Sequence, residues 1–315
     1  MKFRHVKIED MKTPHILCLG GSATIDQIFY VDQVPAPSAK ISANDFVVTG
    51  GGVAANAAVA VQRLGGVATY WGRVGQDSWG DQVLVMLAKE GVNIQYLRQL
   101  AGYRTKVSTV LIDAKGERLV VSAQPQGYPD VIDWLPLQKV AEADAVCVDT
   151  RWIGGAEALL NKASEHGIPS VLDGDSGDAQ IVRRLMHAAT HPVLSEPMLA
   201  KLSHQTVDAS TVGPALAECF GGRNQMVGVT LGAQGVYWFD GKTLAHAPSP
   251  KVAVVDTLAA GDTWHGALAL GLVQQASLEQ AIVFASKAAA LKCTKRGGRL
   301  GIPTLEQLHD FHANY

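Results

Sequence analysis

Hydrophobic and polar positions follow two different periodicities along the chain. Short apolar runs predict buried strands, and longer segments with apolar residues every three to four positions predict helices that pack through one face. The expected strands cover residues 16–19, 68–71, 145–148, 170–172 and 226–230. The expected helices cover residues 54–64, 78–90, 156–166, 212–220, 263–274 and 278–292. This alternation predicts an α/β fold, in which a central, mostly parallel sheet is covered by helices on both faces.

Residue types at the ends of the helices support these boundaries. Ser78 is the expected N-cap of its helix. Gly91 follows the end of the same helix and Gly167 the end of the helix at 156–166, where glycine tolerates the left-handed conformation. Thr304 and Gln307 have the spacing of a capping box and predict a last helix near the C-terminus.

Two regions interrupt the alternation with extended segments that have no helix between them. These are residues 28–34 and 41–48, around Pro35 and Pro37, and residues 106–112 and 117–122, around a turn at 113–116. Such segments predict a small separate sheet inserted into the α/β domain. We expect this sheet to form a lid, with segments at about 28–48 and 106–122, on one α/β domain of residues 13–315. Residues 1–12 are polar and aperiodic and are expected to form an N-terminal tail.

Composition narrows the class of protein. Of the 315 residues, 47% are hydrophobic and 18% are charged, which is typical of a globular enzyme and not of a disordered chain. The net charge of −2 gives no support for a nucleic acid or an anionic membrane as partner. The chain shows no apolar run of membrane-spanning length and no signal peptide, and its four cysteines are scattered. We therefore expect a cytoplasmic protein with reduced thiols.

The stretch from Val254 to Ala269 carries the strongest chemical signal. Three small residues precede Asp262 and a helical pattern; they are Ala259, Ala260 and Gly261. Small residues at the start of a helix leave its unpaired N–H groups open to an anion. A carboxylate beside an anion site is unfavourable unless it acts as a base. We therefore interpret Asp262 as the group that removes a proton from an attacking hydroxyl.

Two glycine-rich segments allow more than one interpretation. Residues 50–56 match the dinucleotide-binding pattern G-x-G-x-x-A, but no acidic residue closes the following strand, as that pattern requires. The same glycines fit tight packing, or a hydroxyl-rich ligand held by bare backbone and Asn56. Residues 230–235 form a turn between two expected strands and are the candidate phosphate loop, since residues 235–243 resemble a Walker A loop only with the wrong spacing.

Together these motifs resemble the signatures of the ribokinase-like (PfkB) family of carbohydrate kinases, over nearly the whole chain after the tail. G-G-x-x-A-N-x-A at residues 51–58 is similar to the first family signature, and D-T-L-A-A-G-D at 256–262 to the second. G-x-V-G-x-D-x-x-G at 72–80 and T-L-G-x-x-G at 230–235 occur in the family order. The resemblance implies a kinase that uses ATP with Mg²⁺, and in many members K⁺, to phosphorylate a sugar hydroxymethyl group. It also implies a homodimer paired through its lids.

The resemblance implies roles for individual residues. In such kinases the aspartate at the position of Asp262 is the base, and the small residues before it form the anion hole. Sugar contacts are implied for Asp26, Gly51, Gly52 and Asn56. Nucleotide contacts are implied for Ser195, Thr230, Gly232, Gln234, Gly235 and Gly297. Asp256 matches a residue near the monovalent-cation site of many members.

One position departs from the family pattern. Where the family has N-x-x-E, this chain has S-E-P-M at residues 195–198. The acid that usually helps to organise magnesium and its waters is therefore missing. Glu196, acting through a water, and Asp173 are the two candidates to replace it.

Two cations point to an anionic substrate. Where a ribokinase presents an acid to its sugar, this chain has Arg151, and Lys40 in the first lid segment is placed to converge on the same end of the ligand. Two cations without a paired acid favour a ligand that brings the anion. The alternative is that Arg151 pairs with Asp149 or Asp175 and does not contact the ligand.

Further motifs are similar to the sulfofructose kinase branch of the family. They include D-x-R-W at 149–152 and A-L-K-C-T-x-x-G-G-R-x-G-I-P at 290–303, although Ser122 stands where an asparagine is expected. The implied substrate is an anionic ketohexose, with 6-deoxy-6-sulfofructose first and a hexose phosphate second. The alternatives are a neutral sugar such as ribose or fructose, and a nucleoside stacked on Phe29, Tyr30 and Phe46 of the lid. The alternative of another class is a dinucleotide-dependent oxidoreductase.

Overall fold

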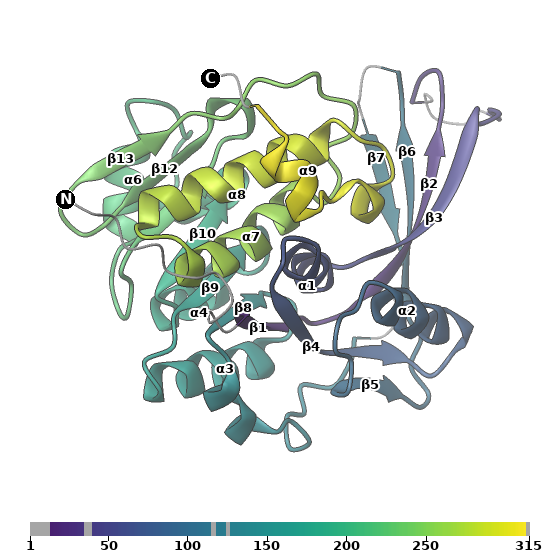
Figure 1. Ribbon diagram of the computed structural model, residues 1–315, viewed down its shortest axis with the longest axis horizontal. Helices are drawn as coiled ribbons and strands as arrows, with labels where there is room; N and C mark the ends of the chain where they lie inside the picture. Colours follow the sequence, from purple (N-terminus) through teal and green to yellow (C-terminus); the bar gives the residue numbers. More distant parts are fainter. Residues whose placement is uncertain (1–12, 35–39, 115–117, 124–126, 313–315) are drawn as a thin grey trace, which may run out of the picture.

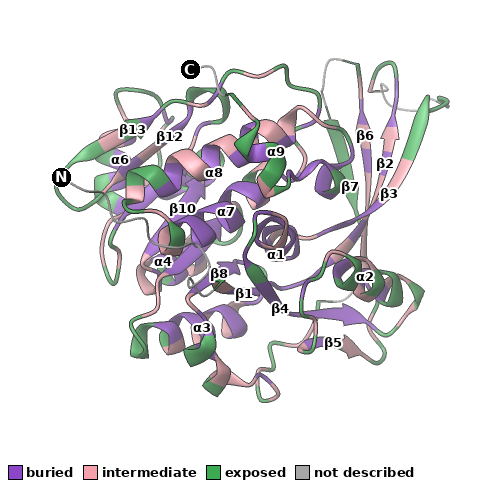
Figure 2. Cartoon of the chain, viewed as in Figure 1, coloured by how far each residue is buried: buried purple, intermediate pink, exposed green. Residues whose placement is uncertain are grey.

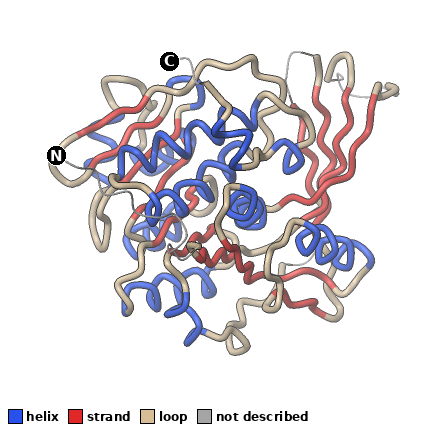
Figure 3. The backbone as a smooth tube through the Cα atoms, in the orientation of Figure 1, coloured by secondary structure: helices blue, strands red, loops and turns tan. Residues whose placement is uncertain are grey.

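A nine-stranded sheet runs through the middle of the molecule (Figure 1, Figure 3). This computed structural model describes residues 13–34, 40–114, 118–123 and 127–312, and the elements given below belong to that part of the chain. In order across the sheet the strands are β13 (Leu244–Ala247), β12 (Val236–Phe239), β11 (Val227–Thr230), β10 (His191–Ser195), β9 (Ser170–Gly174), β8 (Ala145–Asp149), β1 (His15–Leu19), β4 (Val67–Gly75) and β5 (Leu97–Leu100). The strands from β11 to β5 run parallel, and β12 and β13 add two antiparallel strands at one edge. The expected mostly parallel sheet is confirmed.

Helices cover both faces of this sheet because its central strands are apolar on both sides. In β1, Ile16 and Cys18 join the core on one face and Leu17 and Leu19 the core on the other, since successive side chains alternate along a strand. The first core includes α1 (Val53–Arg63), α2 (Ser78–Lys89), α7 (Ala260–Gln274), α8 (Leu278–Cys293) and α9 (Leu305–His309). The second includes α3 (Ile153–Glu165), α4 (Ala179–Ala188), α5 (Glu196–Ser203) and α6 (Val212–Cys219). Figure 2 shows the central strands as largely buried between these layers.

A second, four-stranded sheet stands at one side of the molecule, next to α1 and α2 (Figure 1). Its order is β3 (Asp45–Gly51), β2 (Thr24–Tyr30), β6 (Lys106–Ile112) and β7 (Arg118–Ser122). β2 and β6 pair in parallel, and the two outer pairs are antiparallel. The expected small separate sheet is confirmed, although β2 begins before the expected segment and β3 continues beyond it. The expected tail at residues 1–12, Pro35, Pro37 and part of the turn at 113–116 lie outside the described residues.

Strand β10 was missing from the sequence prediction, and its composition explains why. It begins with His191 and Pro192, and proline normally argues against a central strand because it has no N–H to donate. Pro192 nevertheless lies between β9 and β11, opposite Leu172. Helix α4 was also missed, although Asp178 caps it by accepting from Gln180 N and Ile181 N at 2.9 and 3.1 Å. Asp178 could therefore have been recognised in the sequence as the start of a helix.

The N-cap of α2 is Asp77, not Ser78 as the sequence predicted. Asp77 Oδ1 accepts a hydrogen bond from Gly80 N (2.8 Å), while the backbone of Ser78 is already helical. Two good capping residues stand next to each other here, so composition alone does not decide between them. Asp77 also accepts from the Thr105 hydroxyl (2.7 Å) and from Thr105 N (2.8 Å), which fixes α2 to the base of β6. The predicted capping box of Thr304 and Gln307 is present.

Two sequence predictions concerned membrane-spanning segments and the state of the cysteines. In that part of the chain, no helix combines the length and the hydropathy needed to cross a membrane. All four cysteines are free thiols, and Cys18, Cys147 and Cys219 are buried.

Candidate active site

The start of α7 forms an opening lined by backbone N–H groups. Ala259, just before the helix, has a left-handed backbone with φ of 65°, which is unusual for a residue with a Cβ. Ala260 N donates to Thr257 O (3.2 Å), but among the described contacts the N–H groups of Gly261 and Asp262 have no protein acceptor. Unpaired N–H groups at a helix start, together with the helix dipole, favour an anion. This is the arrangement that the small residues predicted.

Asp262 lies in the first turn of α7, beside these N–H groups. Its Oδ2 accepts a hydrogen bond from Asn56 Nδ2 (2.7 Å), across 206 positions of sequence. Burial, together with the negative charge of Asp173, raises the pKa of Asp262 to about 7. A carboxylate with this pKa is well suited to accept a proton near neutral pH.

Arg299 orients Asn56 from the other side and was not identified from the sequence. Its Nε donates to Asn56 Oδ1 (2.7 Å) and its Nη2 to Gly51 O (2.8 Å). Because Asn56 Oδ1 is held by this cation, its amide N–H group must point toward Asp262. Arg299 is only 2% exposed, and its Nη1 has no hydrogen-bond partner among the described residues. The only sequence signal was an arginine in the glycine-rich segment after α8.

The predicted sugar residues meet beside this pair. The carboxylate of Asp26 faces Gly51 so closely that a Cβ at Gly51 would lie 2.1 Å from Asp26 Oδ2. Gly52 has φ of 97°, and a Cβ there would lie 2.6 Å from Ser22 O. Burial raises the pKa of Asp26, and the positive charge of Arg299 opposes this shift. Asp26, Gly51, Gly52 and Asn56 therefore form one polar cluster around bare backbone.

A cavity of about 400 Å³ lies on the other side of the helix start. Ala260 and Gly261 line one end, and the turn residues Thr230, Gly232 and Gly235 line the other. Gly235 has φ of 90°, and a Cβ there would lie 2.1 Å from Ala247 O. The predicted nucleotide turn and the predicted anion site thus share one cavity.

Three other predicted nucleotide residues do not line this cavity. Gln234 contributes its backbone oxygen to the His246 ring (2.8 Å). Gly297 N donates to Asp256 Oδ2 (3.0 Å). Ser195 is the N-cap of α5, and its hydroxyl donates to Asp175 O (2.8 Å). Their roles toward a nucleotide remain predictions.

Asp173, and not Glu196, is the acid close to Asp262. Glu196 is exposed in the first turn of α5 and lines a different hollow, with Pro197 and Thr206. Asp173 is the second-last residue of β9, is 3% exposed, and leaves its Oδ1 without a hydrogen-bond partner among the described residues. Its charge contributes to the raised pKa of Asp262. Of the two candidates for the missing acid, only Asp173 faces the site.

His265 balances the charge of Asp173. Its Nδ1 lies 2.8 Å from Gly261 O and 3.0 Å from Asp173 Oδ2, and its Nε2 lies 3.2 Å from Val193 O. Both ring nitrogens therefore face acceptors, which requires the doubly protonated, charged form. Burial disfavours that charge, but Asp173 outweighs it and raises the pKa of His265 to about 10. This ion pair was not identified from the sequence.

Arg151 is paired with an acid, contrary to the assumption of two unpaired cations. Its guanidinium donates two hydrogen bonds to the Asp175 carboxylate, at 2.6 and 2.8 Å. Asp149 is fully buried and accepts from Arg151 N (2.9 Å). Lys40 is exposed, and within the described part of the chain no hydrogen bond or ion pair joins it to these residues. The second cation near Arg151 is Lys106 of β6: burial lowers the pKa of Lys106, and the charge of Arg151 adds to this shift.

Asp256 does not offer a site for a monovalent cation. Its Oδ2 accepts from Gly297 N and Gly298 N, both at 3.0 Å, and its Oδ1 accepts from Leu258 N (2.8 Å). The ammonium group of Lys292 lies 2.7 Å from Asp256 O and 3.5 Å from Asp256 Oδ1. Each of these Asp256 oxygens already has a donor, and the ammonium group of Lys292 lies beside them, so Asp256 does not fit K⁺.

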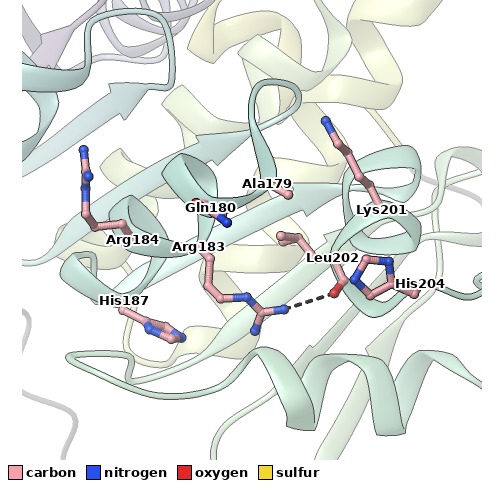
Figure 4. Close-up of a pocket in the computed structure, with 8 residues that line it drawn as sticks. All are labelled: Ala179, Gln180, Arg183, Arg184, His187, Lys201, Leu202 and His204. Atoms are coloured by element: carbon pink, nitrogen blue, oxygen red, sulfur yellow. Dashed lines mark hydrogen bonds between the residues drawn. The ribbon is translucent and has the colours of Figure 1, made fainter.

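A separate basic hollow of about 410 Å³ lies between α4 and α5 (Figure 4). It shares no lining residue with the cavity at α7. Its cations already have partners: Arg183 donates to Leu202 O (3.0 Å) and lies 3.8 Å from Glu218, and Lys201 donates to Gly177 O (2.8 Å). We therefore assign no ligand to this hollow.

Comparison with known proteins places this geometry in a family context. The pattern of the pfkB family carbohydrate kinases matches residues 14–305. Ribokinase from Bacillus subtilis is 26% identical over 297 residues, covering 93% of this chain and 98% of that protein. Ribokinase from Schizosaccharomyces pombe is 28% identical over 301 residues, covering 90% of this chain and 94% of that protein.

The fold is also similar to that of solved structures. A structure from Agrobacterium tumefaciens is 34% identical, with a TM-score of 0.88, and the match covers 95% of this chain and 97% of that chain. Arabidopsis thaliana ribokinase, solved in complex with ribose and ATP, is 24% identical with a TM-score of 0.81, over 95% of this chain and 98% of that chain.

Proposed function

The chain belongs to the pfkB family of carbohydrate kinases, and we propose that it uses ATP to phosphorylate a hydroxymethyl group of an anionic ketohexose. One observation carries the catalytic part of this proposal. Asp262 accepts a hydrogen bond from Asn56 of the polar cluster, and its neighbours Ala260 and Gly261 line the cavity that also holds Thr230. The oxidoreductase alternative is wrong because the family is a kinase family. In addition, strand β3, which precedes the glycine-rich turn, belongs to the small sheet and not to the central parallel sheet.

Each part of the site has a role in phosphoryl transfer. Asp262 takes the proton of the sugar hydroxyl, the freed oxygen attacks the γ-phosphorus, and the bond to ADP breaks. The N–H groups of Gly261 and Asp262 stabilise the charge on the transferred group. Magnesium, bound with the nucleotide, supplies further positive charge to the phosphate oxygens. Asp173 fits this ion, directly or through water, because its Oδ1 is otherwise unpaired.

The four-stranded sheet is proposed to act as the lid. Its strand β2 carries Asp26, and β3 leads into the glycines of the sugar cluster. The inner side of the sheet, with Ile28 and Val110, packs with Leu258 close to the start of α7. Closure of such a lid excludes water, which competes with the sugar as phosphoryl acceptor.

The anionic substrate is supported by Arg151 and Lys106. Arg151 is the second residue after β8, at the carboxyl edge of the parallel sheet, where ligands of open α/β sheets bind. Its charge and that of Lys106 influence each other, so an anion placed between them is stabilised by both. The preferred candidates are 6-deoxy-6-sulfofructose and, second, a hexose phosphate.

A neutral sugar is the second candidate, and one observation favours it. Asp175 already neutralises the Arg151 guanidinium with two short hydrogen bonds. The relatives compared above are named ribokinases, which fits a neutral pentose. A nucleoside is less well supported, because the cross-strand register places Phe29 and Phe46 on the side of the lid opposite Ile28, and of the three expected aromatic residues only Tyr30 is on the side of Ile28.

The test is a coupled ATP-consumption screen with matched sugars. Ribose, fructose, fructose 6-phosphate and 6-deoxy-6-sulfofructose are compared at one ionic strength. We expect the highest kcat/KM for a ketohexose with an anion at C6. Preference for ribose or fructose would establish the neutral-sugar alternative, and absence of ATP turnover with every sugar would refute the proposal.

Replacing Arg151 by methionine is expected to raise KM for the anionic sugar by about 10- to 100-fold, because charge-assisted hydrogen bonds each contribute about 1.5–3 kcal/mol. KM for a neutral sugar should change little. Steady-state kinetics with both sugars measures the difference. Arg151→Lys is the matched control, since it keeps the charge and loses the fork geometry. Equal losses on both sugars would show that Arg151 only holds Asp175.

We also propose a homodimer that pairs through the outer faces of the lids. Phe29 faces Phe46 and Leu111 across the strands, and Leu111 faces Leu119, so these side chains share one face. Phe46 is 48% exposed and Leu119 is 42% exposed. An apolar patch of this kind is typical of an interface.

Replacing Phe46 by lysine is therefore expected to convert a dimer into a monomer at micromolar concentration, because it places a charge in the apolar contact. Sedimentation velocity gives the mass. Val85→Lys is the matched control, because Val85 is 65% exposed on α2, outside the lid. A monomeric unmodified protein would contradict the proposal.

A further inference from the structure

The last turn of α8 buries a lysine completely. Lys292 is 0% exposed, although its charge would normally be solvated. Its Nζ donates to Asp256 O (2.7 Å) and lies 3.5 Å from Asp256 Oδ1. Burying an ammonium group costs free energy unless the group is paired, so the pairing with Asp256 offsets the cost of burying Lys292.

Asp256 in turn fixes the segment that leads into α7. Leu258 N donates to its Oδ1, and the N–H groups of Gly297 and Gly298 donate to its Oδ2. The backbone N–H of Asp256 donates to Cys293 O (3.2 Å), next to Lys292 in the sequence. Residues 255–258 are therefore held between the end of α8 and the glycine turn after it.

This segment determines where the free N–H groups lie. Three residues after Asp256 the chain takes the left-handed turn at Ala259, and α7 starts directly behind it. A shift in the backbone of Asp256 is therefore transmitted to Gly261 and Asp262, because only a short segment separates them. Precise placement of such donors matters, because they stabilise charge only at short distances.

We propose that Lys292 is a built-in cation that holds this segment in its catalytic geometry, so that the enzyme requires no monovalent metal ion. Lys292 acts as a positioning residue, since its ammonium group contacts Asp256 and its side chain does not line the cavity at Thr230. The inference rests on the proposed function for its kinetic consequence. It goes beyond that function by assigning the role of a free cation to a side chain of the protein.

The first test uses the unmodified enzyme and needs no variant. Turnover and ATP affinity are measured in KCl, NaCl and tetramethylammonium chloride at equal ionic strength. Turnover should agree within about twofold among the three salts, and so should ATP affinity, because a twofold difference corresponds to a free energy of only RT ln 2. Stimulation of turnover by K⁺ of more than about fivefold would overturn the proposal.

The second test replaces the internal cation with an external one. Lys292→Ala is expected to lose at least about tenfold in kcat in tetramethylammonium chloride, and to regain most of it in KCl or ammonium chloride, because the shortened side chain leaves space beside Asp256. Lys292→Met fills that space and should lose activity without recovery. Lys287→Ala, on the same helix, is the control and should behave like the unmodified enzyme. A Lys292→Ala variant with full activity in tetramethylammonium chloride would overturn the proposal.

Two readouts separate this inference from the proposed function. Thermal unfolding and ATP binding by calorimetry do not depend on a sugar. Lys292→Ala should show a K⁺-dependent rise in melting temperature that the unmodified enzyme and Lys287→Ala lack. If no sugar is phosphorylated but this rise is present, the proposed function fails and the role of Lys292 stands. If the rise is absent, the role of Lys292 fails whatever the substrate.

Discussion

Replacing Asp262 by asparagine is expected to lower kcat by at least about 10²-fold, the usual contribution of a general base, while ATP still binds. Asparagine keeps the shape of the side chain and its contact with Asn56, but it does not accept the hydroxyl proton. The nucleotide cavity is lined by Ala260 and Gly261 and not by the carboxylate, so its affinity for ATP should be preserved. Single-turnover kinetics and calorimetry measure the two effects separately. Turnover close to that of the unmodified enzyme would contradict the assigned role.

The pH profile supplies an independent control for the same residue. With its pKa raised to about 7, Asp262 is ionised above that pH and protonated below it. A protonated base accepts no proton, so kcat/KM of the unmodified enzyme should fall as the pH decreases through about 7. The residual activity of the asparagine variant should lack this acidic limb. An unchanged limb in the variant would assign the titration to another group.

The sequence predicted those parts of the site that depend on local geometry. The small residues before Asp262 and the glycines at 230–235 impose their conformations within a few positions, so their spacing was informative. Glycine at position 52 was predictable for the same reason, because φ of 97° is accessible to few other residues.

The parts that were missed depend on contacts between distant positions. Arg299 holds Asn56 across 243 positions, and His265 holds Asp173 from a different element. Nothing in the local sequence of either residue indicates its partner. Lys40 was placed near Arg151 by its position in the lid alone, and its role toward the substrate stays a prediction. The strand register instead brings Lys106 to the first pair of β2 and β6, opposite Thr24.

Replacing Ala260 by aspartate is expected to abolish turnover, with a loss of at least about 10²-fold, similar to the removal of one oxyanion donor. Ala260 is the first residue of α7 and lines the cavity together with Gly261 and Thr230. A carboxylate at this position places a negative charge where the transferred phosphoryl group must be stabilised. Two like charges about 4 Å apart repel each other by several kcal/mol at the dielectric of a protein surface. ATP affinity should therefore fall together with kcat.

The matched control is Ala260→Asn, which adds the same volume without the charge. If electrostatic repulsion is the cause, the asparagine variant should keep most of its ATP affinity, and the difference between the two variants should shrink at high salt, because exposed charges are screened. Calorimetry with ATP at low and high ionic strength measures this difference directly. If both variants lose affinity equally at every salt concentration, the side chain acts by filling the cavity. In that case the start of α7 is only a wall of the nucleotide site, and the charge of the transferred group must be stabilised elsewhere.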